Sequence, residues 1–449
     1  MNIIILLCLI TTINTYQEQD FYTQAVVTNN RYQNDDVIWG RPKCLFCGDL
    51  VGAGPEQKPN LYPDITSTYF VANIKLEFGW KLIINGKYPH ARYLSFTIAN
   101  QLNDGQLGNG AYLRGDQIIP DNCSSNPFLS GVPRNITNRN YTITVVQGYP
   151  PAKIPPNTLY TATERTHLSI RIYLVDIGYD GSGGDSIPTV SLLTNNKIIT
   201  GPLLLTILDA RKLGDPNGYQ LNEWKINLKQ SDDPINAPVP RIPFAQVFWN
   251  TPYSVTGLFI WEHPEERVNR YPPDDSGGFA SNPDTKYMVI PYSFGYNEVL
   301  VVTGVKPTHQ YTRYGNQYID ANTQVQYFSV STSAGPCSGE GWQTVYDEEI
   351  PEHYTIVVSW PWLRPINALR ENNVTWLSPG DGEGHYIGAR NWVGVLYFRF
   401  QNNNPNWKES PANIPMPSRT QPLQMDEVVM GKYYPRAKYM SKEEFEAIY

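Results

Sequence analysis

Histidine, cysteine and charge are all scarce in this sequence. Six of its 449 residues are histidine and five are cysteine. The histidines do not stand at the H-x-H or H-x-x-x-H spacing of a zinc site, and neither a phosphate-binding loop nor a dinucleotide fingerprint occurs. With no catalytic constellation among its residues, the sequence predicts a protein that is not an enzyme and that needs no cofactor.

The low charge limits the partners. Charged residues make up 17% of the chain and the net charge is -7, so nucleic-acid binding has no electrostatic support. Apolar segments after the N-terminus are too short to cross a bilayer, which predicts no transmembrane segment.

The N-terminus has the pattern of a secretory signal peptide. The apolar run Ile3–Ile10 is short, and polar residues follow it up to Thr15. We therefore expect residues 1–15 to be removed and the mature protein to be extracellular. Four N-x-Ser/Thr sequons agree with this route and predict N-linked glycans at Asn122, Asn135, Asn140 and Asn373.

The cysteines favour disulfides. Without Cys8 an even number remains in an oxidising compartment: Cys44, Cys47, Cys123 and Cys337. We favour pairing of Cys44 and Cys47 with Cys123 and Cys337 in some order. The alternatives are a local Cys44–Cys47 bridge with a Cys123–Cys337 bridge, and a redox-active CxxC motif.

Tyrosine, proline and glycine are abundant, with 31, 37 and 34 residues. Tyrosine favours strands and the other two interrupt them, so the composition indicates β structure with many turns. Strand patterns occur at residues 69–76, 81–84, 93–99, 141–146, 168–175 and 393–400.

The second half of the chain repeats the pattern of the first. Phe78-Gly79 is echoed by Phe294-Gly295, and the segment from Asn140 is echoed by the segment from His353. Ordered matches at a nearly constant offset are typical of duplication. The sequence thus predicts an all-β protein of two tandem, duplicated antiparallel β-sandwich domains, jelly-roll or immunoglobulin-like.

The domain boundaries follow from these patterns. After the signal peptide we expect an N-terminal arm with the CxxC motif over 16–56, domain 1 over 57–198, a connector over 199–280, domain 2 over 281–400 and a tail over 401–449. The connector is proline-rich and carries a short helix after Pro202, and the spacing of Ser441 and Glu444 predicts a helix cap near the end of the tail.

Two further groups of residues suggest ligands. Asp176, Asp180 and Asp185 lie in a glycine-rich stretch, and such loop carboxylates suit Ca²⁺, although the spacing is not that of an EF-hand. Aromatic residues such as Trp80 and Trp362 could stack on sugars, although most of the aromatics are expected in the core and at interfaces. His90 and His309 occupy matching corners of the repeat, which favours structural roles for both.

Several longer motifs carry a family resemblance. GKYPHARYLSF, RIYLVDIGYDGSGGDSIPTVSL and VYDEEIP-x-HYTIVVS, together with the final GKYYPRAKY, resemble a family of secreted two-domain β-rich proteins found in bacteria and microbial eukaryotes. The resemblance covers most of residues 57–440 and implies no enzymatic activity. The chain also resembles protomers of glycan-coated extracellular fibrils, which implies head-to-tail assembly through an N-terminal segment.

Together these features predict a secreted structural glycoprotein, the subunit of an extracellular filament or surface coat. We expect each copy to bind the next through a strand in the arm, formed by Phe21, Tyr22, Ala25, Val26 and Val27. The alternatives are a carbohydrate-binding protein or polysaccharide-acting enzyme, and a monomeric surface adhesin.

Overall fold

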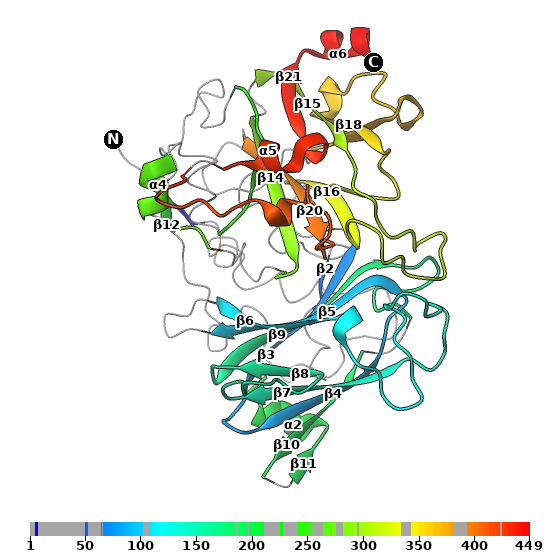
Figure 1. Ribbon diagram of the computed structural model, residues 1–449, viewed down its shortest axis with the longest axis vertical. Coiled ribbons are helices and arrows are strands. Elements are labelled where there is room, and N and C mark those ends of the chain that lie inside the picture. Colours follow the sequence, from blue (N-terminus) through cyan, green and yellow to red (C-terminus); the bar gives the residue numbers. More distant parts are fainter. Residues whose placement is uncertain are drawn as a thin grey trace.

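The computed structural model describes most of the chain from Asp64 onward. The described residues are 5–7, 50–52, 64, 66–101, 107–184, 187–195, 197–210, 225–227, 241–250, 254, 264–270, 272–274, 282–293, 296–333, 343–379, 393–422 and 424–449. Figure 1 shows two β-sandwiches, the lower one from the first half of the chain and the upper one from the second half.

The lower sandwich consists of two five-stranded sheets. The sheet that faces the upper sandwich has the order β2 (Leu50–Gly52), β3 (Ser67–Lys75), β9 (Arg165–Val175), β5 (Ala91–Gln101) and β6 (Leu107–Arg114). The other sheet has the order β11 (Lys197–Ile199), β10 (Thr189–Thr194), β4 (Lys81–Lys87), β7 (Asn140–Gln147) and β8 (Thr158–Thr161).

The upper sandwich is built in the same way. Its inner sheet has the order β13 (Gln246–Val247), β14 (Thr285–Ser293), β20 (Val393–Gln401), β16 (Tyr327–Ser333) and β17 (Thr344–Tyr346). Its outer sheet has the order β19 (Val374–Leu377), β18 (His353–Val358), β15 (Val299–Val305) and β21 (Arg436–Met440).

The strand orders of the two sandwiches correspond except that β11 has no counterpart in the four-stranded outer sheet, and this agreement confirms the predicted duplicated all-β fold. In each sandwich the described pairings are antiparallel except one: β8 runs parallel to β7, and β19 runs parallel to β18. Strand alternation forms each core, because every second side chain points between the two sheets. Phe70, Ala72 and Ile74 of β3 belong to the lower core, and Met288 and Ile290 of β14 belong to the upper core.

A glycine–tyrosine pair recurs in both outer sheets. Gly86 of β4 lies opposite Tyr141 of β7, and Gly304 of β15 lies opposite Tyr354 of β18. In each pair the tyrosine ring covers the glycine so closely that a β-carbon would overlap it. Glycine is therefore required at both positions by close packing in the sheet.

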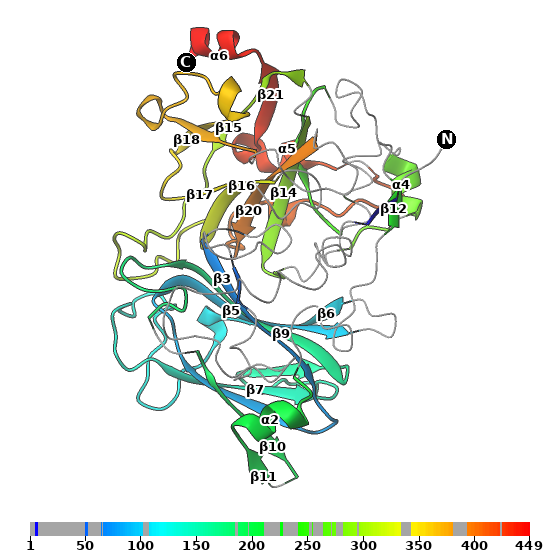
Figure 2. The ribbon, with the colours of Figure 1, turned by 180° about the vertical axis from the view of Figure 1, so that it is seen from behind.

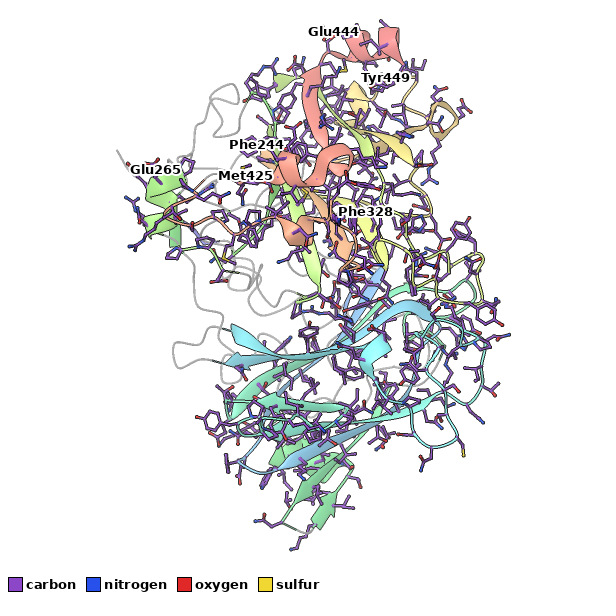
Figure 3. All side chains as sticks on the ribbon, viewed as in Figure 1. Phe244, Glu265, Phe328, Met425, Glu444 and Tyr449 are labelled. Carbon is purple, nitrogen blue, oxygen red and sulfur yellow. The ribbon has the colours of Figure 1, made fainter. Side chains whose placement is uncertain are left out.

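Helices are few and short, as expected. They are α2 (Pro202–Ile207), α4 (Pro264–Arg270), α5 (Asp426–Met430) and α6 (Lys442–Ile448), with 3₁₀ turns η1 (Gly115–Gln117), η5 (Pro361–Leu363), η6 (Arg370–Asn372), η7 (Pro411–Asn413) and η8 (Gly431–Tyr433). The predicted cap of α6 is confirmed: Glu444 N donates to Ser441 Oγ at 3.0 Å, and Ser441 N donates to Glu444 Oε2 at 2.8 Å. Figure 3 places Glu444 and Tyr449 at the end of the upper sandwich farthest from the lower one.

The sandwiches recruit strands from outside the expected domain boundaries. β21 lies in the expected tail yet pairs with β15, and β13 lies in the expected connector yet pairs with β14. The second structural unit therefore extends beyond residues 281–400. Within the expected signal peptide, β1 (Ile5–Leu7) pairs with β12 (Lys225–Asn227). Among the described residues, the helices are too short and too polar to cross a membrane.

The repeated glycine–tyrosine pair yields a prediction. Gly86→Ala and Gly304→Ala should each destabilise the protein by about 1–3 kcal/mol, since the added methyl group displaces a packed ring. Urea unfolding measures the loss. Adding Tyr141→Leu should recover part of the Gly86→Ala loss, because it removes the overlapping ring. If Gly86→Ala is as stable as wild type, the close packing at this pair is not important.

Candidate functional site

The two sandwiches meet through side chains that their inner sheets turn away from their own cores. On β5, Leu94 and Phe96 belong to the lower core, whereas Tyr93 and Ser95 lie on the opposite face and are also buried. Figure 2 shows β3 and β5 next to the ends of β16 and β20. We call this contact the junction. Its apolar members are Tyr93, Tyr173, Leu174, Tyr327 and Tyr346.

Arg92 is a charged residue of the junction whose side chain is fully buried. Its guanidinium forms ion pairs with Asp347 and Glu348 of the upper sandwich, and its Nε donates to Thr312 Oγ1 at 2.9 Å. The same Glu348 oxygen accepts the Thr312 and Arg313 N–H groups, each at 3.0 Å. Asp347 and Glu348 Oε1 are thus bonded to several donors, whereas Glu348 Oε2 is buried without a hydrogen-bond partner among the described residues.

Two basic residues complete the charge cluster around Asp347. Lys306 Nζ donates to the backbone oxygens of Asp347 and Ile350, at 2.5 Å and 2.6 Å. His309 Nδ1 lies 3.6 Å from Asp347 Oδ1. Burial lowers the pKa of both Lys306 and His309, while the Asp347 carboxylate opposes that shift. The structural role suggested for His309 by its place in the repeat stays a prediction.

Asp64 anchors a second network across the junction. Its Oδ2 accepts from Tyr327 Oη and Ser329 Oγ of the upper sandwich, both at 2.6 Å. Its Oδ1 accepts from Thr66 N at 2.9 Å and Thr66 Oγ1 at 2.7 Å, and Arg399 lies 3.9 Å away. Asp64 is therefore fully bonded although it is completely buried.

Asp284 occupies the matching position of the second half and reaches back to the lower sandwich. Its Oδ2 accepts from Tyr93 Oη at 2.7 Å, and Asn282 Nδ2 donates to the same Tyr93 oxygen at 3.0 Å. Burial raises the pKa of Asp284 to about 6. Burial also raises the pKa of Tyr93 well above its usual value, so this hydroxyl stays protonated.

His167 lies further along the same face of the lower inner sheet. Its Nδ1 is 2.7 Å from Asn73 Oδ1, and both residues are buried. Burial lowers the pKa of His167 to about 4, and the charge of Arg171 adds to the shift. The imidazole is therefore neutral at neutral pH, which allows its Nδ1–H to donate to the amide oxygen.

Such shifted pKa values are typical of functional sites, but structural networks cause them too. The contacts of the junction are made across the two halves, and they give Asp64 and Asp347 several hydrogen-bond donors each. His167 bonds to an amide, and the carboxylates of Asp64 and Asp347 bond to arginine, hydroxyl and backbone donors. Chemically, this arrangement holds two domains in one orientation.

The aspartates predicted to bind calcium have other partners. Both oxygens of Asp176 accept from Arg134 Nη2, at 2.6 Å and 2.8 Å. Asp180 Oδ1 accepts from Ser182 N and Ser182 Oγ within its own turn, at 3.0 Å and 2.5 Å. Asp185 lies outside the described residues, so the calcium site stays a prediction. Among the residues that the structure describes, groups of three metal-ligating side chains do not occur.

The sequon asparagines are all exposed: Asn122, Asn135, Asn140 and Asn373. Cys123 is exposed, and no other cysteine lies among the described residues that could pair with it. Cys44, Cys47 and Cys337 lie outside the described residues, as do the predicted assembly residues Phe21, Tyr22, Ala25, Val26 and Val27. The disulfide pairing and the assembly strand therefore stay predictions.

Sequence reasoning placed the motifs but missed the junction. Arg92 stands in the GKYPHARYLSF motif, and Asp347 and Glu348 stand in VYDEEIP. Arg92 is far from Asp347 and Glu348 in the sequence. Their ion pairs can therefore be recognised only in the folded protein, where the two halves are in contact. The available signal was the pair Asp64 and Asp284, which stand in matching Pro-Asp steps of the repeat.

Comparisons with known proteins give structural similarity alone. No family model and no curated protein matches the sequence. An uncharacterised protein from Burkholderia cenocepacia is 12% identical, with a TM-score of 0.40 over 88% of this chain and 79% of that one. A protein from Vibrio parahaemolyticus is 9% identical, with a TM-score of 0.34 over 84% and 90%. An anti-sigma factor domain-containing protein from Clostridium clariflavum has a TM-score of 0.19 at 9% identity over 80% and 83%. At these TM-scores the similarities carry no functional argument.

The buried arginine yields a prediction. Arg92→Met should destabilise the protein by about 3–5 kcal/mol, because it leaves Asp347 and Glu348 buried without their cation. Denaturant unfolding measures this loss. Arg114→Met is the control: Arg114 pairs with Asp116 at 2.9 Å in a partly exposed position, and its loss should cost about 1 kcal/mol or less. Equal losses in the two variants would contradict the importance of burial.

Proposed function

We propose that this protein is a secreted structural glycoprotein, the subunit of an extracellular filament or surface coat. The observation that carries the proposal is the junction, where ion pairs and carboxylate networks hold two β-sandwiches together. A subunit that repeats along a filament needs a fixed shape, and paired buried charges favour one orientation over others.

The exposed sequons support the same proposal. Three of the four asparagines lie between η1 and the start of β7, and all four accept solvent contact, as glycan attachment requires. The predicted signal peptide and the resemblance to secreted two-domain proteins and fibril protomers point to the same compartment. In this proposal the predicted strand of the arm, with Phe21, Tyr22, Ala25, Val26 and Val27, binds the next subunit.

Electron microscopy of the natively secreted protein tests the assembly. We expect regular fibrils from the full mature chain, and single folded particles after deletion of residues 16–43. A Cys123→Ser variant is the control, because it excludes polymers linked through the exposed thiol. Monomers at every concentration would overturn the filament proposal and favour a monomeric adhesin. Fibrils that persist without residues 16–43 would reject the arm as the connector.

A second candidate function is carbohydrate binding, favoured by one aromatic platform. The rings of Trp360 and Trp362 stack with centroids 5.0 Å apart and planes 10° apart, and Trp362 is 67% exposed. Trp362 lies in the short turn η5, between Pro361 and Leu363. A flat, exposed indole held in place is suited to packing against the apolar face of a sugar.

A glycan array tests this second function. If the platform binds sugars, Trp362→Ala should reduce the signal at least tenfold. Phe78→Ala is the matched control, because Phe78 is 76% exposed on the other sandwich. Trp80, the other aromatic candidate, packs against the lower core and is less suited to this role. A bound glycan that Trp362→Ala does not weaken would exclude the platform.

A further inference from the structure

The duplication places one buried carboxyl group in each half, and the two copies are bonded very differently. Asp64 accepts four hydrogen bonds and lies within 3.9 Å of Arg399. Its position in a Pro-Asp step is repeated by Asp284. Asp284 takes part in the reciprocal contact, with Tyr93 in place of Tyr327. A comparison of the two aspartates therefore shows which hydrogen-bond and charge partners of Asp64 have no counterpart at Asp284.

Among the described residues Asp284 forms no ion pair, and its carboxyl group accepts fewer hydrogen bonds than that of Asp64. Its Oδ1 is buried and has no hydrogen-bond partner among the described residues, and the same holds for Ser95 Oγ. In the other copy the corresponding hydroxyl, Ser329 Oγ, donates to Asp64. Arg114 on β6, whose charge acts on Asp284, is bonded to Asp116 at 2.9 Å and 3.0 Å. A negative charge at Asp284 is thus poorly compensated.

We propose that Asp284 makes the junction sensitive to pH. The two sandwiches are held together more tightly when the Asp284 carboxyl group is neutral than when it is ionised. The charged and titratable groups around it are Tyr93 on β5, Arg114 on β6, Asp116 on η1, Arg171 on β9 and Tyr287 on β14. Arg114 and Arg171 stabilise the ionised form, while Asp116 opposes it. Burial outweighs the two arginines.

The direction of the pH effect follows from linkage. Burial raises the pKa of Asp284 to about 6 in the folded protein, against about 3.9 for an aspartate in an unfolded chain. Between these values the folded state holds a proton that the unfolded state has lost. The stabilisation from Asp284 is therefore complete below about pH 4 and disappears as pH rises through about 6.

The test compares wild type with Asp284→Asn from pH 4.5 to 8. In wild type the unfolding equilibrium constant should rise about 10- to 100-fold more over this range than in the variant. The amide keeps an acceptor for Tyr93 but cannot ionise. Hydrogen exchange at Arg134 N, which donates to Gln317 O across the junction at 2.8 Å, gives a local readout. Its protection should decrease above pH 6 in wild type only.

Asp64→Asn is the matched control. It removes the carboxylate beside Arg399, so it should lower stability across the whole range and leave the pH dependence of wild type in place. His167 and Asp426 also titrate with shifted pKa values, but both are present in every variant and cancel in the comparison. If Asp64→Asn does not fold, carboxyl-carbon NMR of wild type still decides. An Asp284 midpoint near 4, or equal pH dependence in wild type and Asp284→Asn, would overturn the proposal.

Discussion

The guanidinium of Arg92 is completely removed from water, and the arrangement of the two sandwiches depends on it. Transfer of a charge to such a site costs several kcal/mol unless partners replace the lost water. The partners are Asp347 and Glu348, which belong to the other half of the chain. Separation of the halves would leave the charges of Arg92, Asp347 and Glu348 without their ion-pair partners. The ion pairs thus add little net stability but strongly select one orientation.

The duplication explains how such a contact can arise. Each half carries a similar arrangement of strands, the same glycine–tyrosine pair and an aspartate at the same step of the repeat. These shared features lie in the cores and sheets, where packing tolerates little change. The halves differ at the junction, where Asp64 has a full set of partners and Asp284 does not. The two aspartates therefore have different partners although they stand at the same step of the repeat.

The sequence was a good guide to features set by neighbouring residues. Strand alternation placed β3, β5, β7 and β9, and the Ser441–Glu444 spacing placed the cap of α6, because both signals span only a few residues. It was a poor guide to β21, which follows the expected second domain at a distance. β21 pairs with β15, more than a hundred residues earlier in the chain, and its short, polar pattern gives no sign of a sheet.

The junction was hidden for the same reason. The Arg92–Asp347 and Asp64–Tyr327 contacts join residues more than 250 positions apart, and their motifs describe corners and turns when read locally. The repeat itself supplied the useful signal, since Asp64 and Asp284 stand at equivalent steps. Their equivalent positions indicate that both aspartates matter for the fold. They do not reveal that each aspartate accepts a hydrogen bond from a tyrosine of the other half.

Because the two halves are similar, like sandwiches of two molecules could pair with each other. The opposite charges of Arg92 and of Asp347 and Glu348 disfavour such pairing. Two copies of the lower sandwich present related surfaces, so they could pair with each other between molecules as well as with the upper sandwich. Such a pairing would bring two Arg92 side chains together without their carboxylates, and pairing of two upper sandwiches would leave Asp347 and Glu348 without the arginine. Unpaired buried charges disfavour both alternatives. The division of the charges between the halves therefore directs each lower sandwich to an upper one and leaves the outer sheets and the exposed sequons for other contacts.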